Sequence, residues 1–210
     1  MLRKVVAWMM QGILGVAGVS AGPIFSEQGD APDTLPGQAT GSGPLTAITG
    51  TIDSATDVDI FTIRIVDPNW YATTTGNSTT IDTRLWLFSL DGMGQTFNDD
   101  DPTQPFQSSI GPGHDPPGGE WVAVGQVYGL AIGAYQIEPR DAADQALWNA
   151  TPFTAERAPD GPGAANPLDH WGFSGFDTGA YQIDLFGIEA VPEPSTLALL
   201  SLALLAVRRR

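Results

Sequence analysis

Residues 59–66 read DIFTIRIV, and this stretch decides the fold class of the chain. Phe61, Ile63 and Ile65 alternate with polar residues along it. Because successive side chains of a β-strand point to opposite faces of its sheet, the stretch has one apolar and one polar face. It therefore predicts a β-strand that packs one face against a core.

Segments on both sides of this strand also have strand composition, and turns rich in Gly, Pro and Asp separate them. Six such segments are LTAITGTI at 45–52, RLWLFSL at 84–90, QTFN at 95–98, EWVAVG at 120–125, VYGLAIG at 127–133 and AYQIDLFGIE at 180–189. RLWLFSL is apolar on both faces, as is typical of a central strand. We therefore expect an all-β fold, a β-sandwich or jelly roll of about seven to nine short antiparallel strands.

The first residues of the chain have the pattern of a secretory signal peptide. Arg3 and Lys4 precede an apolar run, and small residues follow it up to Ala21. This order of charge, apolar run and small residues is read by the export machinery. We expect a signal helix over residues 1–21, cleavage after it, and a linker over residues 22–29 of the exported protein. An N-terminal anchor that is not cleaved is the alternative.

The C-terminus shows the same features in reverse order. The triplet Pro192, Glu193 and Pro194 precedes an apolar run from Leu197 to Val207 and three terminal arginines. The run is shorter than the roughly 20 apolar residues of a membrane-spanning helix. The arginines favour the cytoplasmic side of the membrane. We therefore expect a short apolar helix that inserts transiently into the inner membrane.

Residues 191–210 resemble the PEP-CTERM sorting signal of bacteria that make extracellular polysaccharide. The triplet, the apolar run, the basic end and the terminal position all agree with that signal. The resemblance implies processing near the triplet by an exosortase, a transpeptidase-like membrane enzyme. It also implies a final place in the periplasm, outer envelope or extracellular matrix. A plain tail anchor with a proline-rich stem is the alternative.

Residues 30–190 resemble the bacterial pre-peptidase C-terminal domain, which is a β-sandwich. The matching pieces, in chain order, are GDAPDTLPGQA, GTIDSATDVDIFTIRI, DTRLWLFSLDGMGQTFNDDD, VYGLAIGAY and TGAYQIDLFG. Residues 138–179 depart from the compact form of that domain, because they are longer than it needs. The sequence assigns this irregular stretch no role.

Acidic residues gather before and at the start of the first strong strand. Asp57 and Asp59 are two residues apart, so their side chains can share one face of a strand. Calcium accepts six to eight oxygen ligands from separate segments. The resemblance to calcium-binding members of the pre-peptidase family implies a Ca²⁺ site made of Asp30, Asp33, Asp57 and Asp59. Aspartates that stabilise turns by local hydrogen bonds are the alternative.

A second acidic group consists of Asp99, Asp100 and Asp101. Three adjacent carboxylates repel one another, and a cation would relieve that repulsion. They form a second metal candidate, although solvation in a loop would have the same effect.

Aromatic residues also occur in the irregular stretch. Trp148 and Trp171 are candidates for stacking on sugar rings through their apolar faces. Packing in the core or at its rim is the alternative for both residues.

The charge of the body limits its partners. Residues 22–190 contain four arginines, no lysine and 23 acidic residues, which leaves a net charge of −19. Such a surface argues against nucleic acid as a partner. The sequence contains neither the Gly-x-Ser-x-Gly motif of hydrolases nor a His-Glu-x-x-His motif.

We therefore expect an exported, non-enzymatic protein of the cell envelope or extracellular matrix. It would act by binding, or as a structural component of an exopolysaccharide layer, with Ca²⁺ as its single cofactor candidate. A carbohydrate-binding module and a secreted hydrolase are the alternatives.

Overall fold

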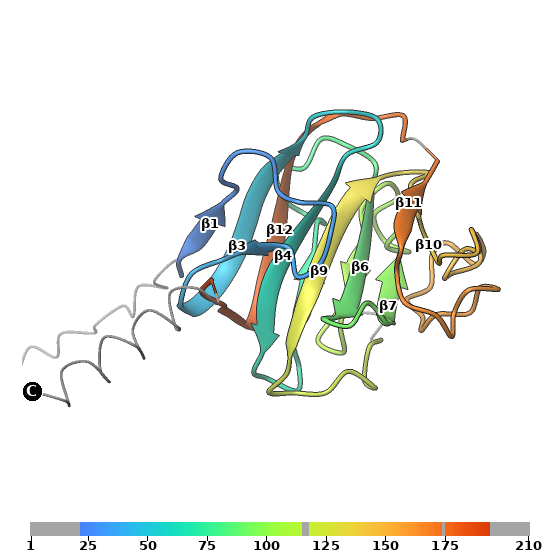
Figure 1. Ribbon diagram of the computed structural model, residues 1–210. Helices are drawn as coiled ribbons and strands as arrows, with labels where there is room; N and C mark the ends of the chain where they lie inside the picture. The colour runs from blue at the N-terminus through green and yellow to red at the C-terminus, as the bar shows by residue number, and fades with distance from the viewer. Residues whose placement is uncertain (1–21, 115–117, 174, 194–210) are drawn as a thin grey trace, which may run out of the picture.

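The computed structural model describes residues 22–114, 118–173 and 175–193, and these residues fold into β-structure (Figure 1). Twelve strands occur among them: β1 (Ile24–Ser26), β2 (Gln38–Ala39), β3 (Gly43–Ile52), β4 (Val58–Ile65), β5 (Tyr71–Thr73), β6 (Thr83–Ser89), β7 (Gly94–Asn98), β8 (Ser109–Ile110), β9 (Val127–Ala134), β10 (Glu138–Arg140), β11 (His170–Gly172) and β12 (Gly179–Ala190). The described residues contain no helix, so the all-β prediction is confirmed.

The two expected terminal helices, over residues 1–21 and over the apolar run that ends at Val207, lie outside the described residues. In the part of the chain that the structure covers, no helix is long and apolar enough to cross a membrane.

The strands form two layers that β12 joins. One layer has the order β4-β9-β6-β7, and the other contains β1, β3 and β12, with β5 and β8 beyond β12. The last three residues of β12 pair with β4, which makes the two layers continuous along one edge. The arrangement is the predicted sandwich, closed on one side by a shared strand.

Gly187 allows β12 to serve both layers. Residues 184–186 pair with β5, whereas residues 188–190 pair with β4. Between Asp184 and Ile188 the register of β12 against β3 also shifts. Gly187 has a φ of +68°, and a Cβ at this position would lie 2.5 Å from the Cβ of Asp67. Glycine adopts this left-handed conformation without steric cost. The change of partner therefore depends on a residue without a side chain.

The inner core lies between the two layers. It receives side chains from β3, β4, β5, β6, β8, β9 and β12. Phe61, Ile63 and Ile65 are fully buried in it. The apolar face predicted from DIFTIRIV is thus confirmed.

An outer core covers the opposite face of β4, β6 and β9. Trp86 and Phe88 of β6 pack there against Leu147 and Trp148 of the irregular stretch. This stretch runs from β10 to β11 beside β6 and β7 (Figure 1). RLWLFSL is apolar on both faces because one face of β6 packs into the inner core and the other into the outer core.

Some predicted elements differ from the structure. Residues 120–125 form turns and not the predicted strand. Their backbone bonds are local or reach β4, as in the donation from N of Gly125 to O of Ile65 at 2.7 Å. Residues 22–29, expected as a linker, contain β1, which pairs with β3 in parallel; β2 and β4 are also parallel. The prediction of an entirely antiparallel fold is wrong for these two short pairs.

Candidate functional site

An acidic cluster lies where the segment after β1 meets the start of β4. Carboxylate oxygens of Glu27, Asp30 and Asp59 lie within 4.8 Å of one another. The sequence predicted two of these residues together. Glu27 is not among the predicted ligands, because it lies in the expected linker of residues 22–29, where β1 is only three residues long and has no detectable period.

Asp59 is the buried member of this acidic cluster. It is fully buried, and its Oδ2 accepts a hydrogen bond of 2.6 Å from the hydroxyl of Tyr181. Its Oδ1 has no hydrogen-bond partner among the described residues. Burial raises the pKa of Asp59 to about 8, and the charge of Glu27 adds to this shift. Since an unpartnered buried carboxylate oxygen is costly, a proton or a cation stabilises it.

Glu27 is held in place by two backbone donors. Its Oε1 accepts from N of Ala31 at 2.7 Å, and its Oε2 accepts from N of Thr51 at 3.0 Å. These bonds connect the segment after β1 to β3. The carboxylate is therefore fixed before any ligand arrives, which reduces the entropy lost on binding.

The remaining two predicted ligands lie beside the cluster. Asp57 and Asp33 line a hollow of about 340 Å³ together with Asp30. Burial raises the pKa of Asp57, although a hydrogen bond from N of Asp53 opposes this, and the charge of Asp30 raises it further. The structure thus brings Asp57 near the cluster and leaves Asp33 at the rim.

The second acidic group does not converge as predicted. Asp99 is buried and accepts two hydrogen bonds from Arg84, of 3.0 Å from Nε and 2.8 Å from Nη2. Asp101 points elsewhere: its Oδ1 accepts from N of Thr103 at 2.7 Å, and its Oδ2 lies 3.3 Å from Nδ1 of His114. The structure therefore does not bring the three adjacent aspartates to one point, because the carboxylate of Asp101 is turned away and accepts from Thr103 and Gln104 of the turn that follows it.

Asp82 takes the place of Asp101 in this region. Oxygens of Asp82, Asp99 and Asp100 lie within 4.8 Å of one another. Burial raises the pKa of Asp82 to about 6, and the charges of Asp100 and Asp99 raise it further. Arg84 already neutralises the most buried carboxylate of this group, so a structural role explains it.

The two tryptophans proposed for sugar stacking belong to the outer core. Trp148 is 4% exposed and packs edge-on against Phe88, with ring centroids 5.8 Å apart. Trp171 is half-buried, and its ring lies 5.1 Å from that of Trp86. Its indole donates to O of Asp33 at 2.7 Å. The stacking prediction is wrong for Trp148, whose ring has no open face, and Trp171 spends its ring on core packing.

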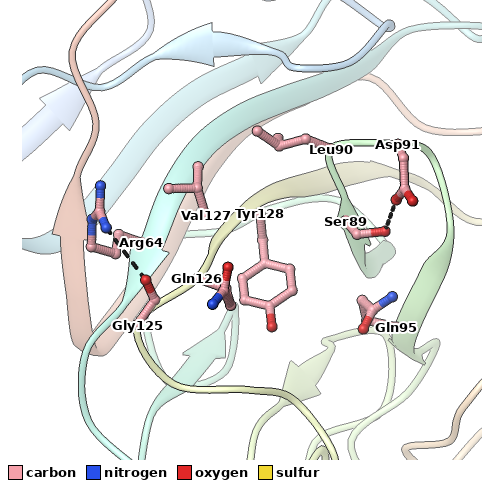
Figure 2. Close-up of a pocket in the computed structure, with 9 residues that line it drawn as sticks. All are labelled: Arg64, Ser89, Leu90, Asp91, Gln95, Gly125, Gln126, Val127 and Tyr128. Atoms are coloured by element: carbon pink, nitrogen blue, oxygen red, sulfur yellow. Dashed lines mark hydrogen bonds between the residues drawn. The ribbon is translucent and has the colours of Figure 1, made fainter.

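A hollow of about 440 Å³ lies near the ends of β4 and β6 and the beginning of β9. Figure 2 shows Arg64 on one side of it, Asp91 and Ser89 on the other, and Gln126 and Tyr128 between them. Sequence reasoning missed this hollow, because its residues come from the ends of β4 and β6 and the beginnings of β7 and β9, and they form no motif.

The sorting triplet begins where the folded body ends. The described residues extend through Pro192 to Glu193, and Pro194 lies outside them. O of Val191 accepts from N of Thr40 at 3.0 Å, while N of Val191 donates to Oγ1 of Thr40 at 3.0 Å. These bonds attach the end of the body to the segment between β2 and β3.

Comparison with known protein families identifies a PEP-CTERM protein-sorting motif at residues 190–210. The chain therefore carries the signal of a secreted protein that an exosortase sorts, as its sequence indicated. No curated protein matches the chain, and neither does any solved structure.

Proposed function

We propose that this chain, which carries an exosortase-read signal, is a non-enzymatic component of a bacterial exopolysaccharide layer. The observation that carries the proposal is the PEP-CTERM motif at residues 190–210. The apolar run and the arginines would hold the C-terminus in the inner membrane until the exosortase acts. The processed body would then reside in the outer envelope or the extracellular matrix.

The end of the body supports processing at the triplet. Val191 is bonded to Thr40 through both its N–H and its carbonyl, so the sheet is complete before Pro192. Removal of the residues after the triplet would leave these bonds intact. The body can therefore remain folded through the sorting step.

Calcium is the cofactor that we propose for this body. The resemblance to the pre-peptidase C-terminal domain suggests it, and the cluster of Glu27, Asp30 and Asp59 supports it. The unpartnered Oδ1 of the buried Asp59 is the strongest single argument, because a cation would satisfy it without a proton. Bound Ca²⁺ would then connect the N-terminal segment to β4.

The bonding of the other acidic residues supports a non-enzymatic role. Asp99 is engaged by Arg84, and Asp101 is engaged by the turn that it begins. A hydrolase with two acting carboxylates needs both to face substrate. Here both of these aspartates hold the protein's own backbone or side chains.

Fractionation of the producing cells tests this proposal. In wild-type cells we expect the mature protein in the extracellular polysaccharide fraction. In cells without the exosortase, or with Glu193→Ala in the triplet, we expect it in the membrane fraction. Asp33→Ala, an exposed change in the body, is the control and should fractionate like the wild type. Equal distribution with and without the exosortase would refute the proposal.

Carbohydrate binding is the second candidate function. One observation favours it, at Trp121 and not at the tryptophans proposed from the sequence. Trp121 is 49% exposed, and its indole donates at 2.8 Å to the backbone O of Gln95, a residue that lines the hollow of about 440 Å³. An exposed indole next to polar side chains is typical of sugar-binding surfaces.

A further inference from the structure

Arg64 differs from the other arginines of the body. Each of the other three forms an ion pair with a carboxylate: Arg84, Arg140 and Arg157. Among the described residues Arg64 forms none, although Glu189 is its cross-strand neighbour on β12. Its Nη1 donates to O of Gly125 at 3.3 Å. In a body with a net charge of −19, a cation without a carboxylate partner stands out.

The hollow beside Arg64 has the polar groups that sugars use. Gln126 offers an amide donor and an amide acceptor, and Asp91 offers acceptors on the opposite side (Figure 2). The amide nitrogen of Gln95 donates to O of Met93 and O of Gly94, both at 3.1 Å, so Gln95 offers its amide oxygen as an acceptor. The hydroxyl of Ser89 donates to Asp91 and orients its carboxylate. The hollow has a volume of about 440 Å³, which lies within the usual range for small-molecule sites.

The rim of the hollow consists of one apolar lining residue and one indole bonded to the lining. Leu90 lines the hollow and is 46% exposed. Trp121 is 49% exposed, and its indole donates to O of Gln95 on β7, which also lines the hollow. The segment that carries Trp121 is also fixed by Tyr128, whose hydroxyl donates to O of Ala123 at 3.0 Å. A rigid apolar rim beside polar groups suits a pyranose ring, which has both apolar faces and hydroxyl edges.

From these features we infer that the hollow binds a uronic-acid residue of an acidic polysaccharide. Arg64 binds the sugar carboxylate, because a guanidinium matches a carboxylate with two parallel hydrogen bonds. Gln95, Gln126 and Asp91 bind the hydroxyls, and Trp121 covers an edge of the ring. This inference rests on the proposed function, since it names the polymer that the layer would supply.

Binding of one defined probe and its neutral counterpart tests the inference. The probe is a trimer of galacturonic acid, and the counterpart is its methyl ester, which keeps the ring and loses the charge. By calorimetry on the mature protein, we expect the acid to bind at least about tenfold more tightly than the ester. Equal affinity for the two would overturn the role of Arg64.

Variants separate the charge from the rim. Arg64→Gln should lower the affinity for the acid about tenfold and leave the ester unchanged. Trp121→Ala should weaken both. Arg140→Gln removes the same charge outside the hollow and should change neither. An unchanged melting temperature confirms that Arg64→Gln folds, and unchanged acid binding by that folded variant would refute the inference.

Failure of the inference and failure of the proposed function give different results. If the protein is found in the polysaccharide fraction but does not bind the acid trimer, the uronate assignment is wrong and the proposed function stands. If the exosortase has no effect on its location, the proposed function is wrong, whatever the trimer shows.

Discussion

The two faces of the layer formed by β4, β9 and β6 are buried in different ways. The inner face packs against other strands, with Phe61 and Ile63 fully buried between the layers. The outer face packs against the irregular stretch, through Leu147 and Trp148. Where strands pack on strands, apolar and polar residues alternate, and the sequence shows this alternation. Where the irregular stretch packs on the sheet, it contributes isolated large side chains, and its apolar residues follow no period.

This difference assigns a role to the long stretch. Trp148 donates to O of Arg157 at 3.2 Å, and Arg157 exchanges backbone bonds with Phe97 of β7. Further bonds to the sheet and its loops come from single residues of the stretch, such as Phe153, Glu156 and Leu168, and do not form a continuous ladder like that between paired strands. We expect the inner core to govern global unfolding, and the outer core to open locally at lower cost.

Truncation in the inner core should have the largest effect. We expect Phe61→Ala to lower the free energy of unfolding by about 3–5 kcal/mol, because it leaves a cavity between the layers. Denaturant titration measures this change. Phe176→Ala, which removes an aromatic ring that is 73% exposed, should change stability by less than about 0.5 kcal/mol. Similar losses for the two variants would contradict the position of the core.

Truncation in the outer core should have a smaller and local effect. We expect Trp148→Ala to cost about 3 kcal/mol, with faster hydrogen exchange in residues 141–169. Amides of β4 and β9 should keep their protection. Loss of protection throughout the body would show that the two cores unfold together, which would contradict local opening of the outer core.

Calcium should stabilise the contact between the segment after β1 and β4, where the acidic cluster lies. At a concentration of about one hundred times its dissociation constant, we expect it to raise the melting temperature by about 5–10 °C relative to chelator. Glu27→Gln and Asp59→Asn should abolish this shift, whereas Asp33→Asn should retain it. The reverse ranking of Glu27 and Asp33 would favour the ligands inferred from sequence over the observed cluster.

The raised pKa values of two carboxyl groups, one in the acidic cluster and one in the irregular stretch, should make the free energy of unfolding depend on pH in the same direction. Burial raises the pKa of Asp59 to about 8. Burial also raises the pKa of Glu156, a residue of the irregular stretch that accepts from Thr96 and Gly111, to about 7. The folded state binds each proton more tightly than the unfolded state does. The stability from these groups is therefore complete below about pH 4 and is lost as the pH rises toward the folded values.

Variants of Asp59 and Glu156 separate their contributions to this pH dependence, which is the smallest of the expected effects. Relative to wild type, Glu156→Gln should flatten the decline of melting temperature between about pH 4.5 and 7, and Asp59→Asn should flatten it up to about pH 8. Added calcium should suppress the share of Asp59 alone. A wild-type stability that rises relative to both variants over this window would contradict the assigned pKa directions.

The sequence predicted features that repeat with a period or match a motif. Alternation in DIFTIRIV and AYQIDLFGIE predicted β4 and β12, and the terminal triplet predicted the sorting signal. Glu27 could not be predicted, because three-residue strands such as β1 have no detectable period. Arg64 and Gln126 could not be grouped either, since only pairing of β4 with β9 brings them to one hollow. The burial of Trp148 could not be predicted, because composition does not distinguish an exposed ring from one that covers a sheet.

The mass of the mature protein's C-terminal peptide tests the central claim most directly. In cells with the exosortase, we expect exported protein that ends near Pro192-Glu193-Pro194 and lacks the apolar run and the arginines. In cells without it, the same peptide should extend to Arg210. Exported protein that retains Arg210 in the presence of the exosortase would contradict the account.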